Sequence, residues 1–340
     1  MKRVPTLADV AQAAGVSKSA ASKAINDRTD VSAATVAKVK AAVDQLGYVV
    51  KTRSAATDVV ALWVVIDGLG NYYSPQVLEG IVLEAEESGA VAVVSQRQGG
   101  PHARRPGSPA WMADAAGKGA QAFILVATDV TAATISAAEQ ADVPLVVLDP
   151  VMRLSSGVAT VGATNFRGGV EATEHLVGLG HTRIAFIGAN PRSHAGGDRL
   201  AGYHDALRRA GIAPDPDLVV PGHFHTEDGL SAEDLLRRPN RPTAIFCGSD
   251  SVALGVYEAC HRLGLRVPED VSVVGFDDGL GADVATPHLT TVRQPLEQMG
   301  RLAVRTAVAA VVGGGPLAPP LEVATKLIVR DSTAPPAQRD

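Results

Sequence analysis

Short apolar segments alternate with amphipathic segments through most of this chain, from residue 59 onward. The apolar segments have the length of a strand and span residues 59–66, 90–95, 122–128, 144–149, 183–189, 243–250 and 271–278. The segments between them repeat apolar residues at helical spacing, as in 74–89, 168–180, 198–211 and 250–264. Continuous apolar strands joined through helices predict parallel sheets with helices on both faces.

The number of these units predicts an α/β core of two doubly wound parallel-sheet subdomains over residues 59–330. About nine strand and helix units exceed what one open sheet usually holds. The chain has 340 residues and 46% apolar side chains, enough for more than one core. The expected ranges are about 59–160 plus 293–320 for the first subdomain, and 161–291 plus 321–330 for the second.

Two late segments are expected to cross between the subdomains, namely a helix at 296–312 and a strand at 321–330. The last ten residues, 331–340, are rich in Pro and polar side chains and predict a flexible tail. In folds of this kind, ligands bind beyond the carboxyl ends of the strands. A cleft between the sheets would be lined by Asp67, Thr128, Asp149, Gly188, Ser249, Asp250 and Asp277.

The first 47 residues predict a separate all-α head with a helix-turn-helix. Thr6 and Asp9 have the spacing of a capping box, Gly15 ends the first helix, and Ser17 caps a second one. Ala21, Ala24 and Ile25 form the apolar stripe of this second helix. Its other face carries Lys18, Ser19, Ser22 and Lys23. Short polar and cationic side chains suit a helix that lies in a DNA major groove, although an ordinary amphipathic helix pair has the same spacing.

The charge distribution favours the DNA-binding interpretation. Residues 1–53 carry a net charge of +5, whereas the whole chain carries −5, so the remainder carries −10. Cations concentrated on the head can replace counterions on phosphates, while the acidic remainder is repelled by the duplex.

Several motifs, in one order along the chain, resemble the lactose-repressor (LacI) family of transcriptional regulators. They are LADVAQAAGVSKSAASKAIND and VSAATVAKVKAAVDQLGY in the head, and EHLVGLGHTRIAFIG, DRLAGYHDAL, RPTAIFCGSDSVALG, GLRVPEDVSVVGFDD and LTTVRQP in the core. The resemblance implies a core like that of periplasmic binding proteins and a homodimer that binds a pseudo-palindromic operator. It also implies a regulator, most simply a repressor, that responds to a small-molecule effector. Sugars and sugar derivatives are the commonest effectors of the family, and nucleobases or nucleosides remain an alternative.

Carried over to this sequence, the base-reading positions of the family correspond to Lys18, Ser19 and Lys23. A lysine can donate to guanine or only to a phosphate, and the sequence leaves both open. The full set of expected DNA contacts is Thr6, Ser17, Lys18, Ser19, Ser22, Lys23 and Asn26.

The resemblance also implies an effector site, with acidic, basic, amide and aromatic side chains suited to a polyhydroxylated ligand. Its residues are Asn71, Tyr72, Tyr73, Asp149, Arg199, Phe224, Ser249, Asp250, Asp277 and Gln294. Simpler interpretations stay open: Asp149 as a strand end, Asp250 as a helix cap and Tyr72 as a core residue. Ser249 stands where many sugar-responsive relatives carry Asn.

The linker at residues 48–58 departs from the family pattern. It is shorter than usual, and no leucine occurs between Leu46 and Leu62 to wedge into the minor groove. Arg53 and Ala55 are the expected hinge residues. Because a methyl group cannot unstack a base step as leucine does, we expect this protein to bend its operator less than a typical relative.

Other chemistry is weakly represented in the sequence. Cys247 and Cys260 lie far apart and predict buried free thiols, and His223 and His225 lack a cluster of further metal ligands. We therefore expect neither cofactor nor metal and no enzyme. No signal peptide and no membrane-length apolar segment is seen, which favours a cytoplasmic protein. A sugar-binding protein of periplasmic type is the alternative, which the basic head disfavours.

Overall fold

The structure is a computed structural model that divides into two compact units, residues 1–58 and 59–340. It describes residues 6–25, 31–46, 59–69, 72–97, 105–154, 158–189, 193–313 and 319–337. The predicted hinge with Arg53 and Ala55 lies outside these residues, as do Asn26 and Asn71.

The described residues of the head form three helices, α1 (Leu7–Ala14), α2 (Lys18–Ile25) and α3 (Ala33–Leu46). The predicted capping box is confirmed, because the Asp9 amide donates to Thr6 Oγ1 at 3.3 Å and the Thr6 amide donates to Asp9 Oδ2 at 2.7 Å. Gly15 ends α1 with a φ of 67°. The three helices share one small core of Val10, Ala11, Ala21, Ala24, Val39 and Ala42.

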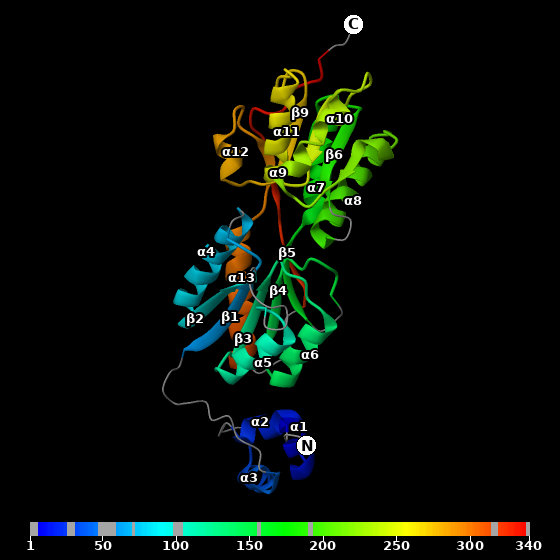
Figure 1. The fold of residues 1–340 in the computed structure, drawn as a ribbon. Helices are drawn as coiled ribbons and strands as arrows, with labels where there is room; N and C mark the ends of the chain where they lie inside the picture. Colours follow the sequence, from blue (N-terminus) through cyan, green and yellow to red (C-terminus); the bar gives the residue numbers. More distant parts are fainter. Residues whose placement is uncertain are drawn as a thin grey trace. The chain divides into compact units, whose positions relative to one another are not determined.

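The first sheet of the core is parallel throughout, in the order β11-β5-β4-β3-β1-β2. Its strands are β1 (Val60–Ile66), β2 (Ala90–Gln96), β3 (Ala122–Val126), β4 (Leu145–Leu148), β5 (Ala159–Ala163) and β11 (Leu321–Val323). Helices α4 (Tyr73–Glu87) and α13 (Leu296–Gly313) cover one face, and α5 (Pro109–Gly117) and α6 (Ala132–Ala141) cover the other (Figure 1).

The second sheet has the order β12-β10-β9-β8-β6-β7 and is parallel except for β12. Its strands are β6 (Ile184–Ala189), β7 (Val219–Pro221), β8 (Ala244–Cys247), β9 (Ser272–Asp277), β10 (Thr290–Arg293) and β12 (Lys326–Ile328). One face packs on α7 (Asn165–Gly178) and α8 (His194–Arg209). The other packs on α10 (Ala232–Leu236), α11 (Asp250–Arg262) and α12 (Leu280–Val284); η2 (Pro216–Leu218) and α9 (Thr226–Gly229) complete this subdomain.

The chain crosses between the two sheets after β5, after β10 and between β11 and β12. The predicted single strand at 321–330 in the second subdomain is wrong, because β11 pairs with β5 in the first sheet. The first subdomain also extends through β5, past the predicted limit at residue 160. The crossing after β5 and the crossing between β11 and β12 are hydrogen-bonded to each other, since the Thr325 amide donates to Thr164 Oγ1 at 2.9 Å.

The prediction of a flexible tail from residue 331 is also wrong for the part that the structure describes. Ser332 is fully buried; its carbonyl accepts from the Val273 amide at 2.9 Å, and its hydroxyl accepts from the Thr290 amide at 2.8 Å. Further along, Ala334 accepts a hydrogen bond from His181 at 2.9 Å. The segment therefore docks on the second subdomain largely through its backbone. Backbone hydrogen bonds of this kind are compatible with a Pro-rich composition.

Helices α4 and α13 pack so closely that a side chain at Gly80 would not fit. A Cβ atom there would lie 2.0 Å from the Glu297 carbonyl oxygen. The same pair is joined by Arg305, which donates to both carboxylate oxygens of the buried Glu84 at 2.8 Å. Because α4 begins at Tyr73 and α13 follows Gln294, this packing fixes two of the predicted effector residues.

Candidate functional site: effector cleft and DNA-reading helix

Most of the predicted effector residues that the structure describes lie near the carboxyl ends of strands in both sheets or at the starts of the following helices. Tyr72 and Tyr73 begin α4, Asp149 follows β4, and Asp277 closes β9. Ser249 and Asp250 begin α11, Gln294 follows β10, Phe224 follows β7, and Arg199 lies within α8. Hydrogen bonds and ion pairs join these residues in pairs: Tyr73 with Asp149, Arg199 with Asp277, Asp277 with Gln294, and Ser249 with Phe224.

Tyr73 and Asp149 form the pair on the first subdomain. The Tyr73 hydroxyl donates to Asp149 Oδ2 at 2.8 Å. Burial raises the pKa of the Asp149 carboxyl, and the Tyr73 hydrogen bond and the nearby Arg199 act against that rise. Burial also raises the pKa of Tyr73 well above its usual value, so its hydroxyl stays a donor. At the end of its strand, Asp149 thus belongs to a half-buried, hydrogen-bonded polar pair.

Arg199 is the central cation on the second subdomain and is only 4% exposed. Its Nε donates to Asn165 Oδ1 at 2.8 Å, and its Nη1 donates to the Gly248 carbonyl at 2.6 Å and lies 3.6 Å from Asp277 Oδ1. The guanidinium lies over the Phe276 ring, 3.7 Å from its centroid. These contacts on several sides fix the position of the guanidinium and of its charge.

Asp277 and Gln294 form the third pair, where the chain leaves the second sheet for α13. Gln294 Nε2 donates to Asp277 Oδ1 at 2.7 Å. Burial raises the pKa of Asp277 to about 6, although Arg199 and Gln294 both lower it. Gln294 is 3% exposed, and its buried Oε1 accepts no hydrogen bond from the described residues. A buried acceptor of this kind is available to a donor on a ligand.

Ser249 and Asp250 use their side chains largely within the protein. Ser249 Oγ caps α11 by accepting from the Val252 amide at 3.3 Å and donates to the Phe224 carbonyl at 3.2 Å. Asp250 accepts from the Gly279 amide at 2.6 Å and from the Thr291 hydroxyl at 2.5 Å. Both carboxylate oxygens are therefore engaged, so the direct effector contact expected for Asp250 stays a prediction.

One close contact crosses from the first subdomain to the second. A Cβ atom at Gly279 would lie 2.6 Å from Cδ1 of the Tyr72 ring, so this ring packs against the backbone that precedes α12. A second link is the His194 amide at the start of α8, which donates to the Val151 carbonyl at 2.8 Å. Tyr72 is half-buried and packs on the other subdomain, so its contact with the effector stays a prediction.

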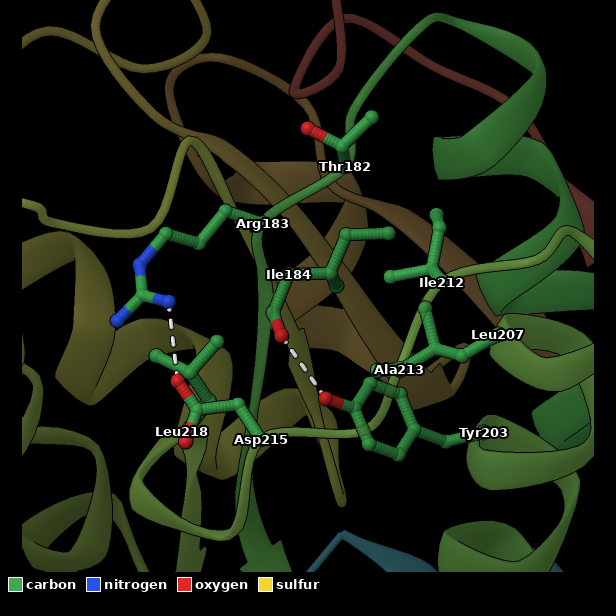
Figure 2. Close-up of a pocket in the computed structure, with 9 residues that line it drawn as sticks. All are labelled: Thr182, Arg183, Ile184, Tyr203, Leu207, Ile212, Ala213, Asp215 and Leu218. Atoms are coloured by element: carbon green, nitrogen blue, oxygen red, sulfur yellow. Dashed lines mark hydrogen bonds and ion pairs between the residues drawn. The ribbon is translucent and has the colours of Figure 1, made fainter.

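A pocket of about 230 Å³ lies at the amino end of β6 and includes none of the predicted effector residues in its lining (Figure 2). Tyr203 lines it but donates to the Ile184 carbonyl at 2.8 Å, and Arg183 is paired with Asp215 at 2.9 Å. Its polar groups are thus committed to one another, and it is a poorer candidate than the cleft.

Sequence reasoning missed Asn165, Phe276 and Gly248, all of which hold Arg199. Asn165 follows a short Gly-containing strand that carries no strong apolar signal. Phe276 lies within a strand that was predicted to be part of the core, and its side chain is indeed fully buried. Only the position of Gly248 after β8 gave a signal, because residues at strand ends were expected to line the cleft.

On the head, the predicted base-reading residues Lys18, Ser19 and Lys23 are exposed, and Ser22 is half-buried. Thr6 and Ser17 cap helices, and Ser17 Oγ accepts from the Ala20 amide at 3.1 Å. Ala21 and Ala24 of α2 face the head's core. The second helix therefore presents its cationic and hydroxyl side chains on one open face, as a groove-binding helix requires.

Comparison with known proteins agrees with this arrangement. Residues 6–50 match the family described as bacterial regulatory proteins, lacI family, and residues 173–333 match the periplasmic binding protein-like domain. The transcriptional regulator CelR of Thermobifida fusca is 35% identical, over 97% of this chain and 99% of CelR. The repressor PurR of Proteus mirabilis (strain HI4320) is 30% identical, over 97% of both chains.

Two solved structures share the whole architecture. The CelR–cellobiose complex has a TM-score of 0.73 at 32% identity, covering 96% of this chain and 99% of that one. The Lac repressor dimer bound to operator and the anti-inducer ONPF has a TM-score of 0.72 at 28% identity, covering 98% and 100%. With relatives at this identity along nearly its full length, the chain belongs to the LacI family of bacterial transcriptional regulators.

Proposed function

We propose that this regulator binds a neutral sugar in the cleft between its core subdomains, and that the sugar sets its affinity for a DNA operator. The observation that carries the proposal is the fixed set of Arg199, Asp277, Asp149 and Gln294. Carboxylates and a guanidinium held at set positions match the vicinal hydroxyls of a sugar.

The charge of the cleft favours a ligand without phosphate or carboxylate groups. Asp149 and Asp277 outnumber the single guanidinium of Arg199, and Arg199 already lies 3.6 Å from Asp277. An anionic ligand would meet uncompensated carboxylates in a buried environment, which is costly. The solved complex of the relative CelR contains cellobiose, a neutral disaccharide, which fits this expectation.

The head supports recognition of the operator through α2. Lys18, Ser19 and Lys23 are exposed on a helix of a three-helix head, and this head has the excess of positive charge. Paired heads in a homodimer would bind the two halves of a pseudo-palindromic operator. Because DNA is the target, we assign the protein to the cytoplasm and expect no enzymatic activity.

The homodimer is supported by an exposed apolar edge on the first sheet. β2 is the last strand of that sheet, and Val91, Val93 and Val94 are 52%, 37% and 40% exposed. On the second subdomain, Leu280 and Val284 of α12 are also exposed. Apolar side chains on an uncovered edge favour burial against a second copy of the chain.

The test begins with an operator selected from random DNA by the purified protein. Gel-shift titration then compares release by cellobiose, glucose 6-phosphate and adenine. We expect a neutral sugar to change the operator affinity, whereas the phosphorylated sugar has no effect. A response to adenine alone would favour the nucleobase alternative, which the relative PurR suggests by its name. Equal affinity of the protein for random DNA and for the selected DNA would contradict binding to a specific operator.

A further inference from the structure

Phe224 has an unusual backbone conformation for an aromatic residue. Its φ is 68°, in the left-handed region that residues with a side chain rarely adopt. It lies in the loop between β7 and α9, in a segment whose neighbours His223 and His225 are exposed. A strained conformation persists only when surrounding contacts determine it.

The contacts that determine it come from Asp228, in α9. Oδ2 of Asp228 accepts a hydrogen bond from the His223 amide at 2.6 Å and another from the His225 amide at 2.9 Å. These are the backbone donors on either side of Phe224. A Cβ atom at Gly222 would lie 2.7 Å from the Asp228 carboxyl carbon, so the loop closes tightly around this side chain.

The Phe224 ring is held at the effector cleft by the same loop. The Phe224 carbonyl accepts from Ser249 Oγ at 3.2 Å, and the ring centroid lies 5.4 Å from the Arg199 guanidinium carbon. The ring and Arg199 meet at Gly248: a Cβ there would lie 3.3 Å from the ring, and its carbonyl accepts from Arg199.

We propose that Asp228 is a positioning residue of the effector site, which fixes the Phe224 ring beside Arg199 so that the ring stacks on the apolar face of a sugar. The inference rests on the proposed function in naming the sugar. The carboxylate of Asp228 does not need to touch the ligand. It acts by presetting the loop, so that binding does not have to order Phe224.

The first test needs no ligand. The full chain is labelled with 4-fluorophenylalanine, which gives one fluorine resonance for each of its six phenylalanines. Phe224→Leu assigns the Phe224 signal. We expect Asp228→Ala to move this signal towards that of the free amino acid, whereas Asp228→Asn, which keeps an acceptor oxygen, leaves it in place. The other five signals report whether each variant is folded. An unmoved Phe224 signal in Asp228→Ala overturns the proposal.

The second test measures cellobiose binding by calorimetry in a double-mutant cycle. We expect Asp228→Ala to weaken binding by about tenfold, since the lost preorganisation must be restored on binding, and Asp228→Asn to bind like the parent. In the Phe224→Ala background, Asp228→Ala should have no further effect, because the ring it positions is gone. Asp234→Ala, which removes an exposed carboxylate from α10, is the matched control.

The two tests separate the possible failures. If the parent chain does not bind cellobiose but the Phe224 signal moves as expected, the proposed ligand is wrong and the role of Asp228 stands. If the losses from Asp228→Ala and Phe224→Ala add, Asp228 does not act through Phe224, and the proposal is wrong even though cellobiose is the ligand.

Discussion

The hydroxyl of Tyr73 and the carboxylate of Asp149 join the start of α4 to the end of β4 through a hydrogen bond of 2.8 Å. Both residues are half-buried, and partial loss of solvent raises the pKa of each. Tyr73 thus supplies a hydrogen-bond donor to a partly desolvated carboxylate. This relationship leads to a first prediction.

Tyr73→Phe should lower the free energy of unfolding by about 1–3 kcal/mol, because Asp149 loses a buried hydrogen-bond donor. Urea denaturation measures this loss. Tyr257→Phe is the matched control, since the Tyr257 hydroxyl donates to a neutral acceptor, the Pro287 carbonyl, at 3.1 Å. We expect a smaller loss there, of about 0.5–1.5 kcal/mol. Equal losses would contradict a special role for the carboxylate.

Asp277 predicts a pH dependence of stability, because burial raises its pKa to about 6. An unfolded carboxyl ionises near pH 4, so the native state binds this proton more tightly. The contribution of Asp277 is fully present below about pH 4 and is lost as the pH rises through 6.

Asp277→Asn removes this titration. We therefore expect the Tm of the variant, minus that of the parent, to increase between pH 4.5 and 7 and then to level off. Thermal unfolding at a series of pH values measures the difference, in which the other titrating groups largely cancel. A difference that stays constant over this range would show that Asp277 does not resist ionisation.

The strands that sequence reasoning located best are those with continuous apolar runs. The run at 90–95 corresponds to β2 (Ala90–Gln96), and that at 271–278 contains β9 (Ser272–Asp277). Three short strands, β5, β7 and β10, were not predicted. They are only three to five residues long, and β5 and β7 contain Gly or Pro, which strands disfavour, so none of the three forms a long apolar run.

The site was predictable to the extent that topology determines it. Residues at the carboxyl ends of strands, such as Asp149 and Asp277, were expected at the cleft, and they lie in one network with Arg199. Asn165 and Asp228 were not found, because each is a single polar residue whose partner is set by tertiary packing. No periodicity in the sequence marks such pairs.

The docked C-terminal segment gives a third prediction. Ser332→Ala removes the acceptor of the buried Thr290 amide and the donor to the Val273 carbonyl, and should cost about 1–3 kcal/mol of stability. Chemical denaturation measures the loss. Asp331→Ala, at the exposed neighbouring position, is the control and should change stability by less than about 0.5 kcal/mol. A neutral Ser332→Ala would show that the tail is undocked in solution.

Lys23 gives a fourth prediction, about sequence reading by α2. If Lys23 donates to a base, Lys23→Ala should weaken binding to the selected operator and relax its sequence preference, by about 1–3 kcal/mol of discrimination. Lys38→Ala removes an exposed cation from α3 instead and should affect selected and random DNA alike. Binding is compared at one salt concentration, because phosphate contacts depend on salt. Equal losses on both DNAs for Lys23→Ala would reduce its role to a phosphate contact.

The contact between Tyr72 and Gly279 gives the last prediction, about closure of the core. Gly279 has a φ of −78°, which alanine also adopts, and the atoms nearest to the new methyl carbon of Gly279→Ala are those of the Tyr72 ring, the first at 2.6 Å. Overpacking of this kind costs about 1–3 kcal/mol. Because the ring belongs to the other subdomain, we expect the substitution to destabilise the arrangement of the two subdomains in which Tyr72 contacts residue 279.

Gly279→Ala should therefore weaken effector binding, and Tyr72→Ala in the same chain should remove that effect. Calorimetry on the four members of the cycle measures the coupling. Gly178→Ala, at the end of α7 where a methyl group meets no atom within 4 Å, is the control for a general effect of the glycine change. If Gly279→Ala weakens binding equally with and without the Tyr72 ring, the contact does not govern closure. Recovery in the double variant would identify Tyr72 and Gly279 as the point where effector binding is coupled to the relative position of the two subdomains.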